Sequence, residues 1–258
     1  MVKVPEELSV IVSESDRVNA LLYAASKKDR VGMTVILGHG AGSNQLSPFM
    51  RLFASGLAVR GFDAMTFNFV YMDQGRRVPD PKAKLEACYR AVIKAATQHK
   101  KLKGNRLAIG GKSMGGRIAS QVAAQEWTGF TGLSDEGGQQ SKKLTSKAGS
   151  SVEIRHADLA GLVLLGYPLH PPGKPEQLRD AHLKDIRAPM LFVQGARDAF
   201  GTPDELRSVI KRLHLPATVY AIEGGDHSLK VPKSAGIPQE QIYQTTMDEI
   251  ARWLGSNE

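Results

Sequence analysis

The chain has 258 residues, of which 41% are hydrophobic and 23% are charged, and its formal net charge is +8. These proportions are typical of an ordinary globular protein and exclude wholesale disorder. No apolar run is long enough to span a membrane, and the first residues lack the blocks of a signal peptide. A lone cysteine, Cys88, cannot form a disulfide within the chain. We therefore expect one cytoplasmic domain over residues 1–258, with no membrane partner.

The positive charges are spread along the chain. Lysines and arginines occur singly or in short clusters, without interleaved aromatic residues or a helix-turn-helix pattern. A solvated surface explains this distribution better than a nucleic-acid interface does. No nucleic-acid partner is expected.

Hydrophobic patterning alternates strands with helices. Residues 7–14 and 18–25 alternate apolar and polar side chains, which predicts an antiparallel pair at a sheet edge. Six later segments have strand character, most of them as continuous apolar runs, at residues 33–38, 62–69, 106–110, 162–166, 190–194 and 218–222. Helical spacing occurs at residues 48–60, 82–99, 114–125, 203–213 and 239–254. Repeated strand–helix units predict an α/β fold, with a mainly parallel, twisted sheet of about eight strands and helices on both faces.

Residues 128–156 interrupt this rhythm. The segment is rich in Gly, Ser, Lys and Gln and has little apolar periodicity. This composition predicts a long, mobile surface loop. We favour a tolerated insertion over an active-site flap.

A serine motif follows the strand at residues 106–110. Gly111-Lys112-Ser113-Met114-Gly115 has the form G-x-S-x-G and lies between a strand and a helix. In that setting the serine occupies a strained turn with its Oγ exposed, and side chains in place of the glycines would collide with the neighbouring strand and helix. Ser113 is the predicted nucleophile.

The same residues also resemble the end of a phosphate-binding loop, G-x-x-x-x-G-K-[ST]. That motif requires a glycine at position 106, where the chain has Arg106. It also requires a loop at residues 107–109, which have strand character instead. Nucleotide binding is therefore disfavoured.

Small residues after the strand at 33–38 predict an oxyanion hole. The segment His39-Gly40-Ala41-Gly42 lets backbone amides approach a substrate oxygen closely. The predicted donors are the amides of Ala41 or Gly42 and of Met114. A degraded dinucleotide-binding motif is the alternative, but its third glycine and its acidic residue are missing.

The acid and base are predicted from two further strand ends. Asp198 lies in a turn after the strand at 190–194, where a buried carboxylate can orient an imidazole. His227 follows the last strand and a Gly-Gly turn, and the other histidines and the adjacent Asp226 fit less well. The order Ser113, Asp198, His227 is the order of such triads in hydrolases of this build. We predict attack by Ser113, formation of an acyl-enzyme and hydrolysis by water.

These motifs resemble the α/β-hydrolase superfamily, from Val35 to the C-terminal helix. HGAGS, residues 67–71, GKSMGGR and residues 166–179 are more specifically similar to a dienelactone-hydrolase-related group. Its eukaryotic members include a testis-expressed protein and a subunit of a chromatin acetyltransferase complex. The resemblance implies the α/β-hydrolase fold and the triad but no substrate. Dienelactone hydrolases proper use cysteine where this chain has Ser113.

The chain returns to the sheet soon after residues 162–166, so we expect no large cap domain and an open site. Candidate substrate contacts come from the strand-end loops, with loop packing as an equal alternative; they are His39, Tyr71, Tyr167 and His170. Positive residues in such loops suggest the hypothesis of an anionic substrate; they are Lys112, Arg76, Arg77 and Lys174.

The sequence therefore predicts a serine hydrolase, similar to carboxylic ester hydrolases, that acts on a small ester, thioester or related acyl bond. The same triad can serve a peptidase or an acyltransferase, and a hydrolase fold can also be kept as a non-catalytic binding scaffold. The mechanism requires no cofactor and no metal, and no ligand cluster suggests either. The expected partner is a small acyl substrate, bound by a monomer or homodimer.

Overall fold

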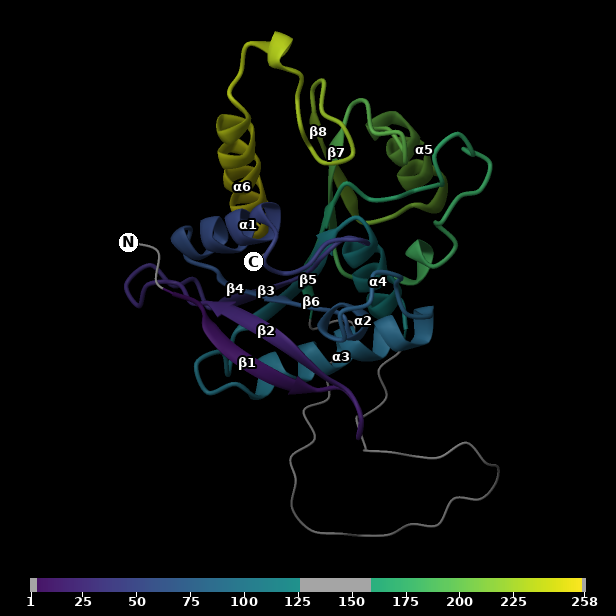
Figure 1. The fold of residues 1–258 in the computed structure, drawn as a ribbon. Coiled ribbons are helices and arrows are strands. Elements are labelled where there is room, and N and C mark those ends of the chain that lie inside the picture. Colours follow the sequence, from purple (N-terminus) through teal and green to yellow (C-terminus); the bar gives the residue numbers. More distant parts are fainter. Residues whose placement is uncertain (1–3, 126–158, 257–258) are drawn as a thin grey trace, which may run out of the picture.

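A central sheet with helices on both faces forms the structure, which is a computed structural model (Figure 1). It describes residues 4–125 and 159–256, so the loop predicted at residues 128–156 lies outside the described residues. The eight strands have the order β1-β2-β4-β3-β5-β6-β7-β8. The β1–β2 and β2–β4 pairs are antiparallel, and all other neighbours are parallel. The predicted fold class is confirmed.

The strands are β1 (Glu6–Ile11), β2 (Arg17–Tyr23), β3 (Met33–Gly38), β4 (Asp63–Phe67), β5 (Arg106–Lys112), β6 (Leu159–Leu165), β7 (Met190–Gly195) and β8 (Ala217–Ile222). The helices are α1 (Pro48–Val59), α2 (Val70–Asp73), α3 (Lys82–Gln98), α4 (Met114–Ala123), α5 (Pro203–Leu213) and α6 (Gln239–Gly255). Within the described part of the chain, no helix is long and apolar enough to cross a membrane.

Local hydrogen bonds explain where the boundaries differ from the prediction. β1 ends at Ile11 because the amides of Val12 and Ser13 turn to the carbonyl of Asp16. β4 ends at Phe67, and the short helix α2 that follows was not predicted. Between β6 and β7 the described chain forms only loops and a 3-10 helix at Leu183–Asp185, so the predicted absence of a large cap domain holds there.

Two apolar cores lie on opposite faces of the sheet. Successive strand side chains point to opposite faces, so Ile36 joins the core under α3, α4 and α5, whereas Val35 and Leu37 join the core under α1 and α6. Figure 1 shows α1 and α6 together on one side and α3 and α4 on the other. Both faces of the central strands are therefore covered, which explains their continuous apolar sequences.

Helix α4 approaches the ends of the central strands very closely. A Cβ atom at Gly115 would lie 2.1 Å from the carbonyl oxygen of Gly38 in β3. A Cβ atom at Gly110 in β5 would lie 1.9 Å from the carbonyl oxygen of Val163 in β6. Gly115 thus lets α4 lie against the end of β3, and Gly110 lets β5 and β6 pack closely beneath it.

Replacement of Gly110 by alanine should destabilise the fold. The new methyl group would force β5 and β6 apart, and overpacking of this kind costs about 1–3 kcal/mol or more of the free energy of unfolding. Urea denaturation followed by circular dichroism measures the change. Gly255→Ala is the control, because a Cβ atom at the end of α6 meets no atom within 4 Å. Equal denaturation midpoints for Gly110→Ala and the wild type would contradict the close approach of β5 and β6.

Candidate active site

The carboxyl ends of β5, β7 and β8 bring three predicted residues together. Ser113 directly follows β5, Asp198 lies in the turn after β7, and His227 lies in the loop after β8. Because these strands are parallel, their carboxyl ends meet at one edge of the sheet. The three side chains thus meet although they lie 29 and 114 positions apart along the chain.

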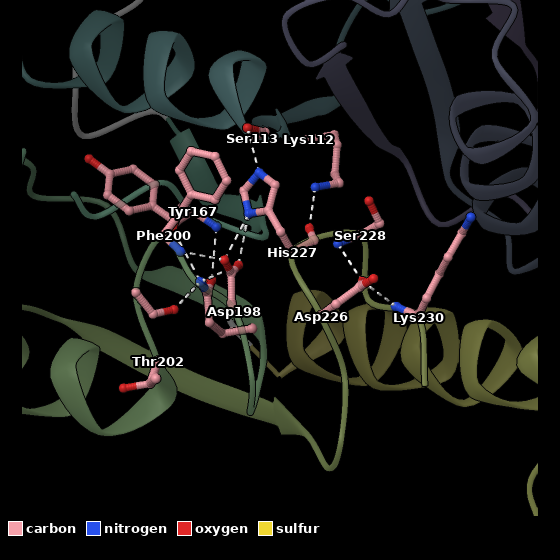
Figure 2. Close-up of polar contacts among 12 residues, drawn as sticks. Lys112, Ser113, Tyr167, Asp198, Phe200, Thr202, Asp226, His227, Ser228 and Lys230 are labelled. Atoms are coloured by element: carbon pink, nitrogen blue, oxygen red, sulfur yellow. Dashed lines mark hydrogen bonds and ion pairs between the residues drawn. The ribbon is translucent and has the colours of Figure 1, made fainter. Parts of the chain in front are cut away.

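A continuous chain of hydrogen bonds links the three side chains (Figure 2). His227 Nε2 lies 2.8 Å from Ser113 Oγ, and His227 Nδ1 lies 2.8 Å from Asp198 Oδ2 and 3.0 Å from Asp198 Oδ1. A carboxylate can only accept here, so Nδ1 carries the proton. Nε2 is then free to accept the hydroxyl proton of Ser113. The arrangement suits transfer of a proton from serine to imidazole.

Ser113 occupies a strained turn between β5 and α4. Its φ of 51° and ψ of −115° lie in a region that residues other than glycine rarely adopt, at a cost of order 1–3 kcal/mol. Its amide donates to the carbonyl of Leu165 in β6 at 2.9 Å. Gly111, with φ of 147° and a Cβ position 2.2 Å from the carbonyl oxygen of Gly38, makes the approach to this turn possible. The backbone therefore holds the Ser113 hydroxyl out of the sheet.

Asp198 is held by donors other than His227. The carboxylate is 2% exposed and accepts hydrogen bonds from the Phe200 amide at 2.8 Å and from Gln194 Nε2 at 2.8 Å. Gln194 is fully buried and also contacts the carbonyl of Gly201 at 2.7 Å. Sequence analysis missed Gln194, although an amide at the end of an otherwise apolar strand was a usable signal. These donors fix the carboxylate in the orientation that His227 requires.

Contacts on two sides position His227. The ring of Phe200 packs against the imidazole with a centroid distance of 4.1 Å and a tilt of 32°. Lys112 Nζ donates to the backbone carbonyl of His227, which ties the loop after β8 to the end of β5 (Figure 2). Burial lowers the pKa of Lys112 to about 8, against the opposing effect of the Asp198 and Asp226 charges. Asp226 itself accepts from the Ser228 and Lys230 amides and closes the turn.

The predicted oxyanion loop lies beside Ser113. Ala41 and Met114 both line the cavity that Ser113 faces, whereas Gly42, with φ of 70°, turns the chain next to them. Met114 is the first residue of α4, where the amides have no partner within the helix. Such amides point toward any negative charge that develops near Ser113 Oγ.

His39 supports this loop from beneath. Its Nδ1 donates to the carbonyl of Gly40 at 2.8 Å, and its Nε2 accepts from the amide of Phe69 at 3.2 Å. Only the neutral ring can do both. Burial lowers the pKa of His39 to about 4. The ring therefore fixes the loop after β3 against the loop after β4.

The structure does not bring the four candidate substrate contacts to the cavity. His39, Tyr71 and Tyr167 are fully buried, His170 is 5% exposed, and none of the four is among the residues that line the cavity. Tyr167, for example, turns inward and donates from its hydroxyl to the carbonyl of Arg179 at 2.9 Å. All four side chains pack into the fold, and Tyr71 lies within helix α2, which was not predicted.

Of the four positive residues behind the hypothesis of an anionic substrate, one lines the cavity and three do not. Lys112 lines the cavity, but Arg76, Arg77 and Lys174 do not. Arg76 forms an ion pair with Asp80 at 2.6 Å. Two other cavity arginines, Arg117 and Arg179, were missed by sequence analysis.

The cavity at this edge has a volume of about 780 Å³. One wall comes from α1 and α6 and is largely apolar, with Pro48, Phe49, Met50, Leu52 and Tyr243. The other lining residues include Ser113 and His227, the predicted oxyanion residue Ala41, and two arginines, Arg117 and Arg179. Within residues 4–125 and 159–256, no three His, Cys, Asp or Glu side chains are grouped so that they could hold a metal ion.

The lowered pKa of His39 predicts that the fold loses stability in acid. Below about pH 6.5 the unfolded chain gains a proton at His39 that the folded chain does not gain until about pH 4. The free energy of unfolding therefore falls as the pH drops through this range, by up to roughly 1.4 kcal/mol per pH unit. His39→Gln removes the titrating group but keeps a donor and an acceptor. Urea denaturation at a series of pH values should show a smaller acid-induced loss in this variant, and an undiminished loss would contradict the neutral, buried ring.

Solved structures of other proteins share this fold. A serine hydrolase homologue from Coxiella burnetii is 15% identical, with a TM-score of 0.65 over 100% of this chain and 99% of that chain. A dienelactone hydrolase from Anabaena variabilis is 17% identical, with a TM-score of 0.66 over 98% of this chain and 99% of that chain. A serine hydrolase without a lid from Xanthomonas campestris is 14% identical, with a TM-score of 0.64 over 100% of this chain and 94% of that chain.

At these identities the likeness concerns the fold, and the narrower resemblance to the testis-expressed and chromatin-complex relatives stays a prediction. The family model for the alpha/beta hydrolase domain matches residues 31–255, which is most of the chain. The protein therefore belongs to the alpha/beta hydrolase domain family.

Proposed function

We propose that this protein is a serine hydrolase that cleaves a small ester, thioester or related acyl bond. The observation that carries the proposal is the hydrogen-bonded chain from Ser113 through His227 to Asp198, which opens into the 780 Å³ cavity. A serine hydroxyl is a weak nucleophile unless a base removes its proton. In this structure the base already lies at hydrogen-bond distance, and the serine is held in the strained turn typical of such nucleophiles.

The proposed reaction has two halves. His227 Nε2 takes the proton of Ser113 Oγ as the Oγ atom attacks the acyl carbon, and the amides of Ala41 and Met114 stabilise the oxyanion. The alcohol or thiol then leaves with the proton from His227, and the acyl group remains on Ser113. Water repeats the attack on the acyl-enzyme, with His227 again as the base. The acid product departs, and Ser113 regains its proton.

Asp198 stabilises the imidazolium that forms in each half-reaction. It keeps the proton on Nδ1 before attack and balances the positive charge of the ring afterwards. Because Asp198 is buried and held by Gln194 and Phe200, it needs little reorganisation during the reaction. No step in this scheme requires a cofactor. A location in the cytoplasm and a monomeric or dimeric state stay predictions.

The proposal predicts that a fluorophosphonate probe labels the protein at Ser113. Ser113→Ala should abolish labelling, since it removes the nucleophile. His227→Ala should reduce the labelling rate by at least about a thousandfold, because triad residues act as a unit. Labelling is measured by gel fluorescence and intact-protein mass spectrometry on variants whose circular dichroism matches the wild type.

Ser228→Ala is the matched control, because Ser228 lines the same cavity. This variant should keep the labelling of the wild type. A folded wild-type protein that stays unlabelled would contradict the proposal and favour a binding scaffold.

The same proteins distinguish the acyl bonds. Short-chain esters and thioesters should be hydrolysed with a dependence on Ser113, and small peptides should not. Hydrolysis of the peptides alone would instead assign a peptidase to this site.

A further inference from the structure

The cavity carries an unbalanced positive charge. Among the described residues that line it, four are lysine or arginine and none is aspartate or glutamate; the four are Lys112, Arg117, Arg179 and Lys230. Asp198 is buried behind His227 and does not line the cavity, although its charge and that of Asp226 act on Lys112. The side chains that line the cavity therefore carry a net positive charge, which favours an anionic ligand.

Two of these cations have no partner among the residues that the structure describes. Arg117 and Arg179 are partly buried, and neither guanidinium has a hydrogen bond or an ion pair within residues 4–125 and 159–256. The Nε atom of Arg117 is fully buried and has no hydrogen-bond partner in this part of the chain. Asp180, the carboxylate next to Arg179 in sequence, binds Arg212 instead. Elsewhere partly buried arginines are paired, as Arg60 is with Asp248.

Arg117, Arg179 and Ser113 all line the same cavity. Arg117 follows Ser113 by one helical turn, since its amide donates to the Ser113 carbonyl at 3.0 Å. Burial and then the positive charge of Arg117 lower the pKa of Arg179. Two like charges in a partly dry site cost free energy that a bound anion would recover. Paired guanidinium groups offer the forked donors that match carboxylate and phosphate oxygens.

We propose that the substrate carries an anionic group, a carboxylate or a phosphate, which Arg117 and Arg179 bind while Ser113 attacks the acyl carbon. This inference rests on the proposed hydrolase function and names its substrate class. The part of the lining that comes from α1 and α6 is largely apolar, with Phe49, Leu52 and Tyr243. The substrate is therefore an acyl compound with an anionic end and an apolar end.

A matched series of esters tests the charge preference. Ethyl pentanoate is neutral, monoethyl glutarate replaces its terminal methyl group by a carboxylate, and ethyl 4-phosphonobutanoate places a phosphonate there. A pH-stat measures hydrolysis of each. The wild type should show a kcat/KM about tenfold to a hundredfold higher for at least one anionic ester, the range that a charge-assisted hydrogen bond produces. Whichever of the two anionic esters has the higher kcat/KM shows whether the site prefers a carboxylate or a phosphate group.

Variants assign the preference to the two arginines. Arg117→Gln and Arg179→Gln should each lower the ratio of anionic to neutral kcat/KM by about tenfold or more. Arg187→Gln, at an exposed arginine that does not line the cavity, should keep the wild-type ratio. Equal kcat/KM for neutral and anionic esters, or a ratio that neither Arg117→Gln nor Arg179→Gln changes, would overturn the inference.

A binding measurement separates this inference from the proposed function. Calorimetry should show that Ser113→Ala binds monoethyl glutarate and that adding Arg117→Gln weakens this binding at least tenfold. If the wild type cleaves no ester but this arginine-dependent binding remains, the hydrolase proposal fails and the anion site stands. If ethyl pentanoate is cleaved without any anionic preference, the hydrolase proposal stands and the anion site fails.

Discussion

The close approach of α4 to the ends of β3 and β5 is the constraint on which the site depends. Gly115 lies against the backbone of β3, and Gly111 lies against the same carbonyl from β5. Any side chain there would lift α4 from the sheet. Ser113 would then lose the turn that aims its hydroxyl at His227, and the first amides of α4 would move away from the oxyanion loop. The glycines thus set the geometry of both the proposed nucleophile and the proposed oxyanion donors.

Buried polar side chains add hydrogen bonds that hold in place the residues positioned by this packing. Gln194 and the Phe200 amide orient Asp198, His39 joins two loops beneath the oxyanion segment, and Lys112 ties the His227 loop to β5. Each of these groups is desolvated, so each contributes only when its partners are in place. The reacting groups are therefore supported by a shell of hydrogen bonds that leaves them few alternative positions.

The sequence was sufficient to predict those features of the fold and site that depend on a local pattern of residues. Strand character followed by a glycine-flanked serine located the turn at Ser113, and strand ends located Asp198 and His227 because parallel strands share a carboxyl edge. The direction of loop side chains was not predictable in this way. Tyr167 follows β6 but points into the core, and His170 lies against Glu205, whereas Arg179 in the same segment reaches the cavity. Packing against residues far away in the sequence decides where these side chains point, and the spacing of apolar residues along the chain does not reveal that packing.

The order of the strands has a consequence for the assembly of the proposed site. Among the described strands, β8 lies at one edge of the sheet and is the last along the chain. His227 follows β8, so Ser113 gains its hydrogen-bond partner only when β8 has joined β7. Under the proposed function, a chain with this edge strand detached would keep Ser113 on its turn but lose the base that activates it.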